Sequence, residues 1–160
     1  MCMEQRRKQH RLQQYDYSTG GAYFITICTK DRKNLFWQVG ASIARPDEIR
    51  LSEIGEIVKR SICAIPSHYP QVTVDHYVVM PNHVHILLQI HDDFGRAMLA
   101  PTISRIVQQM KGYVTKQAGF SLWQKLYYDE VIRNESHYLH CWNYIEGNPS
   151  KWLEDEYYQT

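Results

Sequence analysis

Runs of apolar and β-branched residues predict four strands along the chain. The run AYFITICTK, at 22–30, has the aromatic and β-branched composition of a strand. Two more runs, at 72–80 and 83–90, are separated by a Pro-Asn dipeptide, which is typical of a turn. We therefore expect these two strands to pair as a hairpin. The last run of this kind, LYYDEVI, spans 126–132.

Apolar residues spaced about 3.6 positions apart predict three helices, at 51–65, from Thr102 to Gly119, and at 135–147. Ser52 and Asn134 are placed to cap the first and the last of these helices, because their side chains can accept a hydrogen bond from a free backbone N–H group. Pro66 is expected to end the first helix.

The predicted order of elements is strand, helix, strand, strand, helix, strand, helix. Its first six elements match the ferredoxin-like βαββαβ unit, an antiparallel sheet with helices packed on one face. We therefore predict an α+β, ferredoxin-like fold with an additional C-terminal helix. A chain of 160 residues suits one domain, 1–160, in which 1–20 form a basic N-terminal arm and 134–160 hold the last helix and a tail.

The net charge of +1 gives no bulk electrostatic argument for nucleic acid, but the charge is unevenly distributed. Four basic residues against Glu4 give the first eleven positions a local charge of +3 (4 − 1), and these residues are Arg6, Arg7, Lys8 and Arg11. Such an arm can follow a phosphate backbone, and it can equally be a solvated tail.

The four cysteines are far apart in the sequence and include no Cys-x-x-Cys pair. This spacing argues against a zinc knuckle and against a disulfide framework. No apolar run approaches the roughly 18 residues of a membrane span, and no signal peptide is evident. We therefore expect a cytoplasmic protein with no membrane partner.

Two histidines, His83 and His85, stand one residue apart in the apolar run VVMPNHVHILL. Residues i and i+2 of a strand point to the same face, so both side chains can bind one metal ion. A pair of buried structural histidines is an equally good interpretation, because the chain holds eight histidines and close pairs arise by chance. The nearby Asp75 and His76 make no recognisable spacing for a third ligand.

Tyr144 and Asn148 lie four positions apart in the last predicted helix, where they share one face. A phenol beside an amide oxygen fits a nucleophile beside a metal ligand. Tyr113 and Gln117 repeat this arrangement on the preceding helix, and the spacing alone does not choose between the two pairs.

Four segments, VMPNHVHILL, MKGYVTKQAG, LWQKLYYDEVIRNE and YIEGNPSKW, resemble in their order the single-tyrosine HUH transposases, and most closely the REP-associated tyrosine transposases. The resemblance covers nearly the whole chain. It implies that His83, His85 and Asn148 bind a divalent metal ion, Mg²⁺ or Mn²⁺. It further implies that Tyr144 is the nucleophile, since Tyr113 does not match that position.

The resemblance also implies the activity of a DNA transposase, which cleaves and rejoins hairpin-containing single-stranded DNA through a 5′-phosphotyrosine, as a monomer or a homodimer. DNA contacts are expected from basic residues of the arm and of the helix from Thr102, namely Arg6, Arg7, Lys8, Arg11, Arg105 and Lys111. The alternative from another class is a non-catalytic module of ferredoxin-like fold that binds single-stranded nucleic acid.

Overall fold

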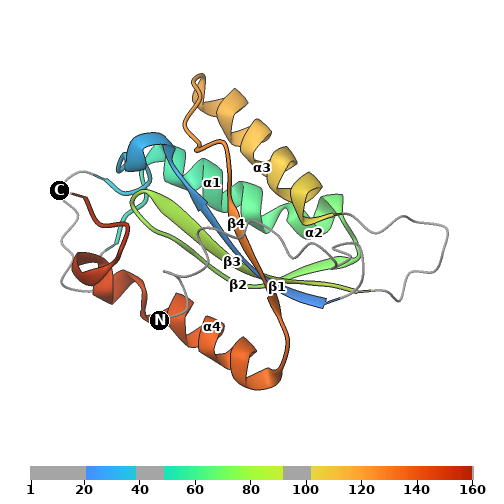
Figure 1. Ribbon diagram of the computed structural model, residues 1–160. Helices are drawn as coiled ribbons and strands as arrows, with labels where there is room; N and C mark the ends of the chain where they lie inside the picture. Colours follow the sequence, from blue (N-terminus) through green and yellow to red (C-terminus); the bar gives the residue numbers. More distant parts are fainter. Residues whose placement is uncertain (1–20, 39–48, 92–101, 160) are drawn as a thin grey trace.

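Four strands form one antiparallel sheet in the order β2-β3-β1-β4, with β3 and β1 at its centre (Figure 1). The strands are β1 (Gly21–Cys28), β2 (Val72–Val79), β3 (His83–Ile90) and β4 (Tyr128–Ile132). The computed structural model describes residues 21–38, 49–91 and 102–159. The basic residues expected in the N-terminal arm, Arg6, Arg7, Lys8 and Arg11, lie outside these described residues.

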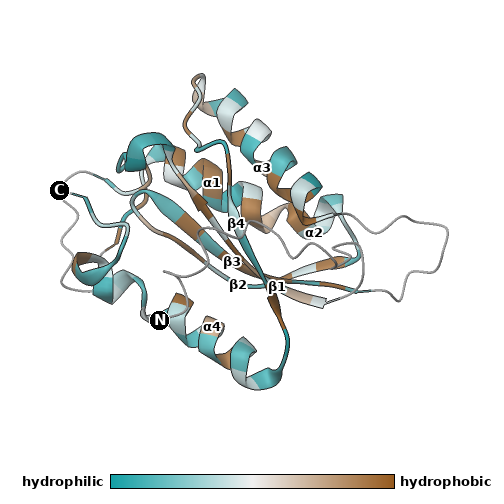
Figure 2. Ribbon diagram, viewed as in Figure 1, coloured by the Kyte–Doolittle hydropathy of each residue, from teal (hydrophilic) through white to brown (hydrophobic). Residues whose placement is uncertain are grey.

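Helices cover both faces of the sheet. Those on one face are α1 (Glu53–Cys63), α2 (Ile65–His68) and α3 (Ile103–Ala118), and α4 (Glu135–Gly147) lies on the other face (Figure 1). The main apolar core lies under α1 and α3, where hydrophobic positions follow the strands and the adjoining helices (Figure 2). The cluster under α4 is much smaller and consists of Phe24, Leu87, Cys141 and Ile145. The position of α4 therefore depends more on polar contacts than the positions of α1 and α3 do.

The alternation of side chains along the central strands decides which residues face α4. In the β1–β3 ladder, Phe24 pairs with Leu87, Thr26 with His85 and Cys28 with His83. The positions between them on β3, such as Val84 and Ile86, belong to the main core on the other face. The strand period of two thus separates the histidines from the core.

The predicted ferredoxin-like α+β fold is confirmed, together with its hairpin and its C-terminal helix. The Ser52 side chain accepts a hydrogen bond from Gly55 N (3.0 Å), and Asn134 caps α4 in the same way (2.8 Å). The expectation for Pro66 is wrong. The helix α1 ends before it, and Pro66 lies in the first turn of α2, where its missing N–H group breaks no helical hydrogen bond.

Gly55 marks a close contact of α1 with the segment before it. A Cβ atom at this position would lie 2.1 Å from Phe36 O, so the two backbones approach as closely as only glycine permits. Gly112, within α3, has no heavy atom within 4 Å of the equivalent Cβ position. Gly55 is therefore required by the close approach of two backbones, whereas the space around Gly112 would accept a side chain.

The chain after α4 turns back towards the sheet. Asn148 keeps right-handed helical dihedral angles (φ −62°, ψ −46°) although Pro149 follows it, and the 3-10 helix η3 (Pro149–Glu154) continues the chain. Trp152 and Tyr157 are nearly fully buried against the main core. The C-terminal tail, residues 149–159, therefore covers the end of the sheet at which β3 begins. Within the described residues, no helix is long and apolar enough to cross a membrane.

Candidate active site

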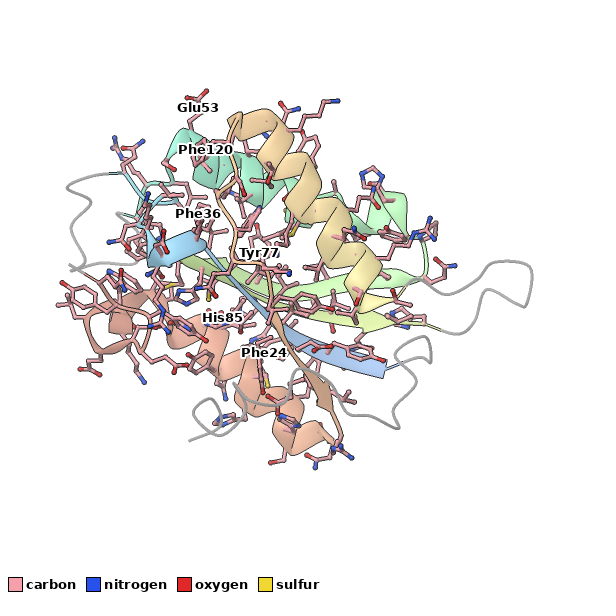
Figure 3. The ribbon with its side chains drawn as sticks, turned by 45° about the horizontal axis from the view of Figure 1, so that its top comes forward. Phe24, Phe36, Glu53, Tyr77, His85 and Phe120 are labelled. Atoms are coloured by element: carbon pink, nitrogen blue, oxygen red, sulfur yellow. The ribbon has the colours of Figure 1, made fainter. Side chains whose placement is uncertain are left out.

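His83 and His85 stand at the start of β3, with both side chains on the face that α4 covers. Their ring centroids are 4.7 Å apart, and both residues are fully buried. Figure 3 shows the labelled His85 and Phe24 between the strands and α4. The two imidazoles thus share one face, as the period of a strand predicts.

Asn82 fixes the proton of the His83 ring. The Nδ2 atom of Asn82 donates hydrogen bonds to Tyr157 O (2.6 Å) and Arg32 O (3.1 Å), so its Oδ1 atom faces the opposite way. This oxygen accepts a hydrogen bond from His83 Nδ1 (2.8 Å). Because an amide oxygen cannot donate, Nδ1 carries the proton and Nε2 keeps its lone pair. The Tyr157 ring packs on the same imidazole, with centroids 4.4 Å apart.

His85 is oriented by the neighbouring strand β1. Its Nδ1 atom lies 2.8 Å from Thr26 Oγ1, directly across the ladder. Phe24 stacks on the imidazole with ring centroids 5.2 Å apart. A proton on Nδ1 directed at the threonine hydroxyl leaves Nε2 with a lone pair, and outer hydrogen bonds of this kind orient histidine ligands in metal sites.

The Nε2 atoms of both histidines are buried and make no hydrogen bond within the described residues. Leaving such an atom unsatisfied costs about 1–3 kcal/mol, so the arrangement requires an explanation. Burial lowers the pKa of His83 well below its usual value, and it lowers the pKa of His85 to about 3. Both rings are therefore neutral at neutral pH, the form in which imidazole binds metal ions.

The two histidines need a ligand of another kind to complete a site. Across the parts of the chain that the structure describes, no three His, Cys, Asp or Glu side chains are grouped closely enough to hold a metal ion. Amide oxygens of Asn and Gln side chains are among the other protein ligands that a hard divalent cation accepts.

Tyr144 lies on the side of α4 that faces the histidines. Its ring centroid is 5.2 Å from that of His85 and 6.1 Å from that of Phe24, edge-on in both cases. Burial raises the pKa of Tyr144 above its usual value, the charge of Asp155 raises it further, and side-chain hydrogen bonding with Asn148 opposes the rise. The phenol is therefore protonated at neutral pH, and its use as a nucleophile requires a positive charge or a base nearby.

Asn148 ends α4 one turn after the tyrosine and is 4% exposed. Its Nδ2 atom is buried and makes no hydrogen bond of standard geometry among the described atoms, although the side chain lies close enough to Tyr144 to lower the pKa of the phenol. The oxygen and nitrogen of an amide exchange places on rotation by 180°, so this side chain can present Oδ1 at the same position. The structure thus brings together the residues predicted for the site, which are His83, His85, Tyr144 and Asn148.

Asp155 enters the same site from the C-terminal tail, and sequence reasoning missed it. Its side chain is 3% exposed, and its Oδ2 atom lies 3.8 Å from His83 Nε2. Burial raises the pKa of this carboxyl to about 6, although the hydrogen bond donated by Tyr157 N (2.7 Å) opposes the rise. The sequence shows only that the tail is acidic. It gives no sign of the turn at η3 that returns Asp155 to the sheet.

Among the residues that the structure describes, polar pairs attach α4 to the sheet. Tyr138 Oη donates to Asp75 Oδ2 (2.6 Å), His76 Nε2 lies 2.6 Å from Glu146 Oε2, and His137 Nε2 lies 2.5 Å from Glu130 Oε1. A β-bulge in β2 lets the adjacent residues Asp75 and His76 both turn towards α4. These two residues, which lie near the histidine pair in the sequence, therefore hold the helix that carries Tyr144.

The other residues considered in the sequence lie away from this site. Tyr113, the rival nucleophile, is 47% exposed on α3, across the sheet from α4. Arg105 is exposed near the start of the same helix. Lys111 is more confined, because its Nζ atom donates to Gln124 O (2.6 Å) and Lys125 O (3.3 Å). Arg105 therefore has more freedom than Lys111 to reach a phosphate.

Comparisons with known proteins give relatives along most of the chain. No protein-family model matches it. An uncharacterized protein of Haemophilus influenzae is 35% identical over 172 residues, which cover 95% of this chain and 93% of that protein. A REP-associated tyrosine transposase of Escherichia coli is 23% identical over 139 residues, which cover 84% of this chain and 70% of that protein.

One solved structure with the same fold is that of a REP-associated tyrosine transposase bound to a REP hairpin. The similarity has a TM-score of 0.58 at 21% sequence identity and covers 88% of this chain and 73% of that chain. At this identity, the match to the solved structure shows the fold.

Proposed function

The chain belongs to the family of REP-associated tyrosine transposases, and on this premise we propose that it is a metal-dependent enzyme that cleaves and rejoins single-stranded DNA. One observation carries the proposal: buried atoms of His83, His85 and Asn148 lack hydrogen-bond partners, and Tyr144 lies beside His85 and Asn148. Unsatisfied polar atoms in a protein interior are costly unless a ligand completes their bonding.

A divalent metal ion, Mg²⁺ or Mn²⁺, fits these atoms. His83 Nε2, His85 Nε2 and Asn148 Oδ1 would hold it, and when bound it supplies the positive charge that neutralises a scissile phosphate. Two imidazole ligands favour Mn²⁺ over Mg²⁺, which prefers oxygen ligands. We therefore expect Mn²⁺ to support the activity better.

Tyr144 is the proposed nucleophile. Its Oη atom forms a bond to the phosphorus of a phosphodiester, the P–O3′ bond breaks, and the 3′ oxygen leaves as a hydroxyl with a proton, while the phenol proton passes to a base or to water. The product is a 5′-phosphotyrosine and a free 3′-hydroxyl. Because the covalent link keeps the energy of the broken bond, the reverse attack by a 3′-hydroxyl rejoins the strand without another energy source.

The proposed substrate is single-stranded DNA that contains a hairpin. Its support is the structural relative that is bound to a REP hairpin. Phosphate contacts are proposed for Arg105 and Lys111 on α3 and for the N-terminal arm, whose basic residues are Arg6, Arg7, Lys8 and Arg11. Such contacts position the strand, and base contacts then select the sequence.

A denaturing gel with end-labelled hairpin DNA and Mn²⁺ tests this function. The wild-type protein should retain label in a covalent adduct, and Tyr144→Phe should retain none. Tyr113→Phe is the matched control and should form the adduct as the wild type does. An adduct that persists in Tyr144→Phe and disappears in Tyr113→Phe would overturn the assignment. DNA binding with no adduct in any metal would favour the non-catalytic binding module instead.

A further inference from the structure

The carboxylate of Asp155 is buried and makes no direct ion pair with a lysine or arginine of the described residues, although the charge of Arg32 acts on it from a distance. Its side chain is 3% exposed, and within the described residues its ion-pair contact is to His83, at 3.8 Å from Nε2. That distance is too long for a hydrogen bond. Because Asn82 holds the His83 proton on Nδ1, Nε2 faces Asp155 with a lone pair and not with a proton. A buried carboxylate in such a place requires a cation or a proton.

The separation of the two atoms suits a shared metal ion. Two ligand atoms that each lie about 2.1 Å from one cation are separated by roughly 3.0 Å at a right angle and roughly 4.2 Å when they stand opposite each other. The 3.8 Å between Asp155 Oδ2 and His83 Nε2 falls inside this range. Of the two atoms, His83 Nε2 is buried and has no hydrogen-bond partner among the described residues.

The same contacts that fix His83 also fix Asp155. Tyr157 packs its ring on His83 and donates its backbone N–H to Asp155 Oδ1 (2.7 Å). The carbonyl of Tyr157 accepts a hydrogen bond from Asn82, the residue that sets the His83 proton. The tail therefore delivers the carboxylate to the imidazole as one packed unit.

We propose that Asp155 is a further ligand of the catalytic metal ion, added by the C-terminal tail to the two histidines and Asn148. The inference rests on the metal site of the proposed function. One carboxylate changes the ligand set from neutral to singly negative, and it supplies the oxygen ligand that Mg²⁺ and Mn²⁺ prefer. The described histidines and carboxylates form no group of three that could hold an ion as they stand, so the proposed ligand set would have to move closer together on binding.

Calorimetric titration of the full chain with MnCl₂, without DNA, tests the inference. Asp155→Asn should weaken the binding of Mn²⁺ at least tenfold. Removing even a hydrogen-bond partner of a metal ligand lowers metal affinity by about 10–100-fold. Glu154→Gln, an exposed carboxylate one residue earlier, is the matched control and should bind as the wild type does. Asp155→Glu keeps a carboxylate and should recover most of the affinity.

Unchanged affinity in Asp155→Asn, or no binding of Mn²⁺ by the wild type, would overturn the inference. Circular dichroism of each variant shows whether it is folded, and if Asp155→Asn unfolds, Asp155→Ser replaces it with the same loss of affinity expected. The covalent-adduct assay separates this inference from the proposed function. If the protein forms the adduct in Mn²⁺ but binds the metal equally well without the Asp155 carboxylate, the proposed function stands and Asp155 is not a ligand. If metal binding depends on Asp155 but no adduct forms, Asp155 is a ligand and the proposed function is wrong.

Discussion

At the scale of single residues, the His83 imidazole depends on Asn82, whose amide atoms are all engaged within the protein. Two backbone carbonyls bind its NH₂ group, and this leaves Oδ1 to hold the proton on His83 Nδ1. Without that oxygen, the ring can move its proton to Nε2 and lose the lone pair that a metal needs. Asn82 is therefore a positioning residue for a metal ligand.

Asn82→Ala should weaken the binding of Mn²⁺ by roughly 10–100-fold, because outer hydrogen bonds of metal-bound histidines contribute about that much. Calorimetry measures the affinity, and ¹⁵N NMR of the histidine rings reports which nitrogen carries the proton. Asn34→Ala is the control, since Asn34 also donates to the tail, at Gln159 O (3.0 Å), but reaches neither histidine. An unchanged proton on Nδ1 in Asn82→Ala would contradict this role.

The choice of metal is a second prediction at this scale. Adduct formation should stop when a chelator removes divalent ions, and it should return more strongly with Mn²⁺ than with Mg²⁺ when each is saturating. The reason is that two of the proposed ligands are imidazole nitrogens, which Mg²⁺ binds poorly. Gel assays over a range of each metal measure both effects, and higher saturated activity in Mg²⁺ would contradict the ligand set.

The sequence predicts some of these residues and not others for a physical reason. His83 and His85 are adjacent on one strand, so their shared face follows from local periodicity. Tyr144 and Asn148 are paired by helical spacing, but a resemblance was needed to prefer them to Tyr113. Asp155 reaches the histidines only through tertiary packing of the tail, and no local pattern encodes such a contact.

At the scale of elements, α4 is attached to the sheet mainly through polar pairs. Among the described residues, the buried apolar side chains of α4 are Cys141 and Ile145, with Tyr138, Trp142 and Tyr144 packed against the same cluster in part. The bulge in β2 adds polar contacts through Asp75 and His76. A helix held in this way keeps Tyr144 in place through bonds that single substitutions can remove. The bulge is invisible in the sequence, because nothing in VTVDHYVV interrupts the strand pattern.

Tyr138→Phe should remove one of these bonds and lower the stability by about 1 kcal/mol near neutral pH. Burial and the hydrogen bond to Asp75 raise the pKa of Tyr138 to about 12, above the value near 10 of an unfolded tyrosine. The folded state therefore holds this proton more tightly. Its contribution is complete below about pH 10 and is lost as the pH rises through about 12.

Absorbance titration of the phenols and thermal melts at several pH values measure this effect. The difference in stability between the wild type and Tyr138→Phe should shrink to nothing at strongly alkaline pH. Tyr113→Phe, which alters an exposed phenol, should show no such difference. A constant difference across the whole pH range would mean that the hydrogen bond to Asp75 is not its cause.

Two glycines provide a matched test of the helices. Gly55→Ala should destabilise the protein by about 1–3 kcal/mol, because the new Cβ atom meets the Phe36 carbonyl and forces α1 away. Gly112→Ala should stabilise it by about 0.5–1 kcal/mol, since its Cβ position is open and alanine favours a helix. Denaturant unfolding measures both. A stabilising Gly55→Ala would contradict the close contact.

Helix starts are more predictable than helix ends in this chain. Ser52 and Asn134 cap the helices as expected, because a cap needs only a polar side chain within the first turn. Pro66 misleads because proline stops a helix in its interior but is well accepted at its start. Here the chain ends one helix early and begins another, and the sequence does not distinguish the two outcomes.

At the scale of the whole molecule, the sheet separates a helical layer that carries Arg105 from the layer that carries Tyr144 (Figure 1). The overall topology is predictable because seven elements in a fixed order allow few compact arrangements. The path of the tail is less predictable, since it depends on where Trp152 and Tyr157 find apolar partners.

The basic arm should contribute to DNA affinity mainly through phosphates. Deleting residues 1–11 removes Arg6, Arg7, Lys8 and Arg11, and the slope of log affinity against log salt should fall by up to about 3, at about 0.7 for each contact to a single strand. Fluorescence anisotropy with a labelled hairpin measures this slope. Arg105→Gln should lower it by about 0.7, and an unchanged slope after the deletion would identify the arm as a solvated tail.

The separation of the two faces of β3 makes the length of the turn before it part of the active site. Inserting or deleting one residue between Val79 and His83 would shift the pairing of β3 by one residue. Val84 and Ile86 would then lie under α4, and both imidazoles would lie in the main apolar core. Point changes in this turn leave the spacing intact. We therefore expect selection to remove insertions or deletions of one codon in the turn between Val79 and His83, even where it tolerates substitutions in that turn.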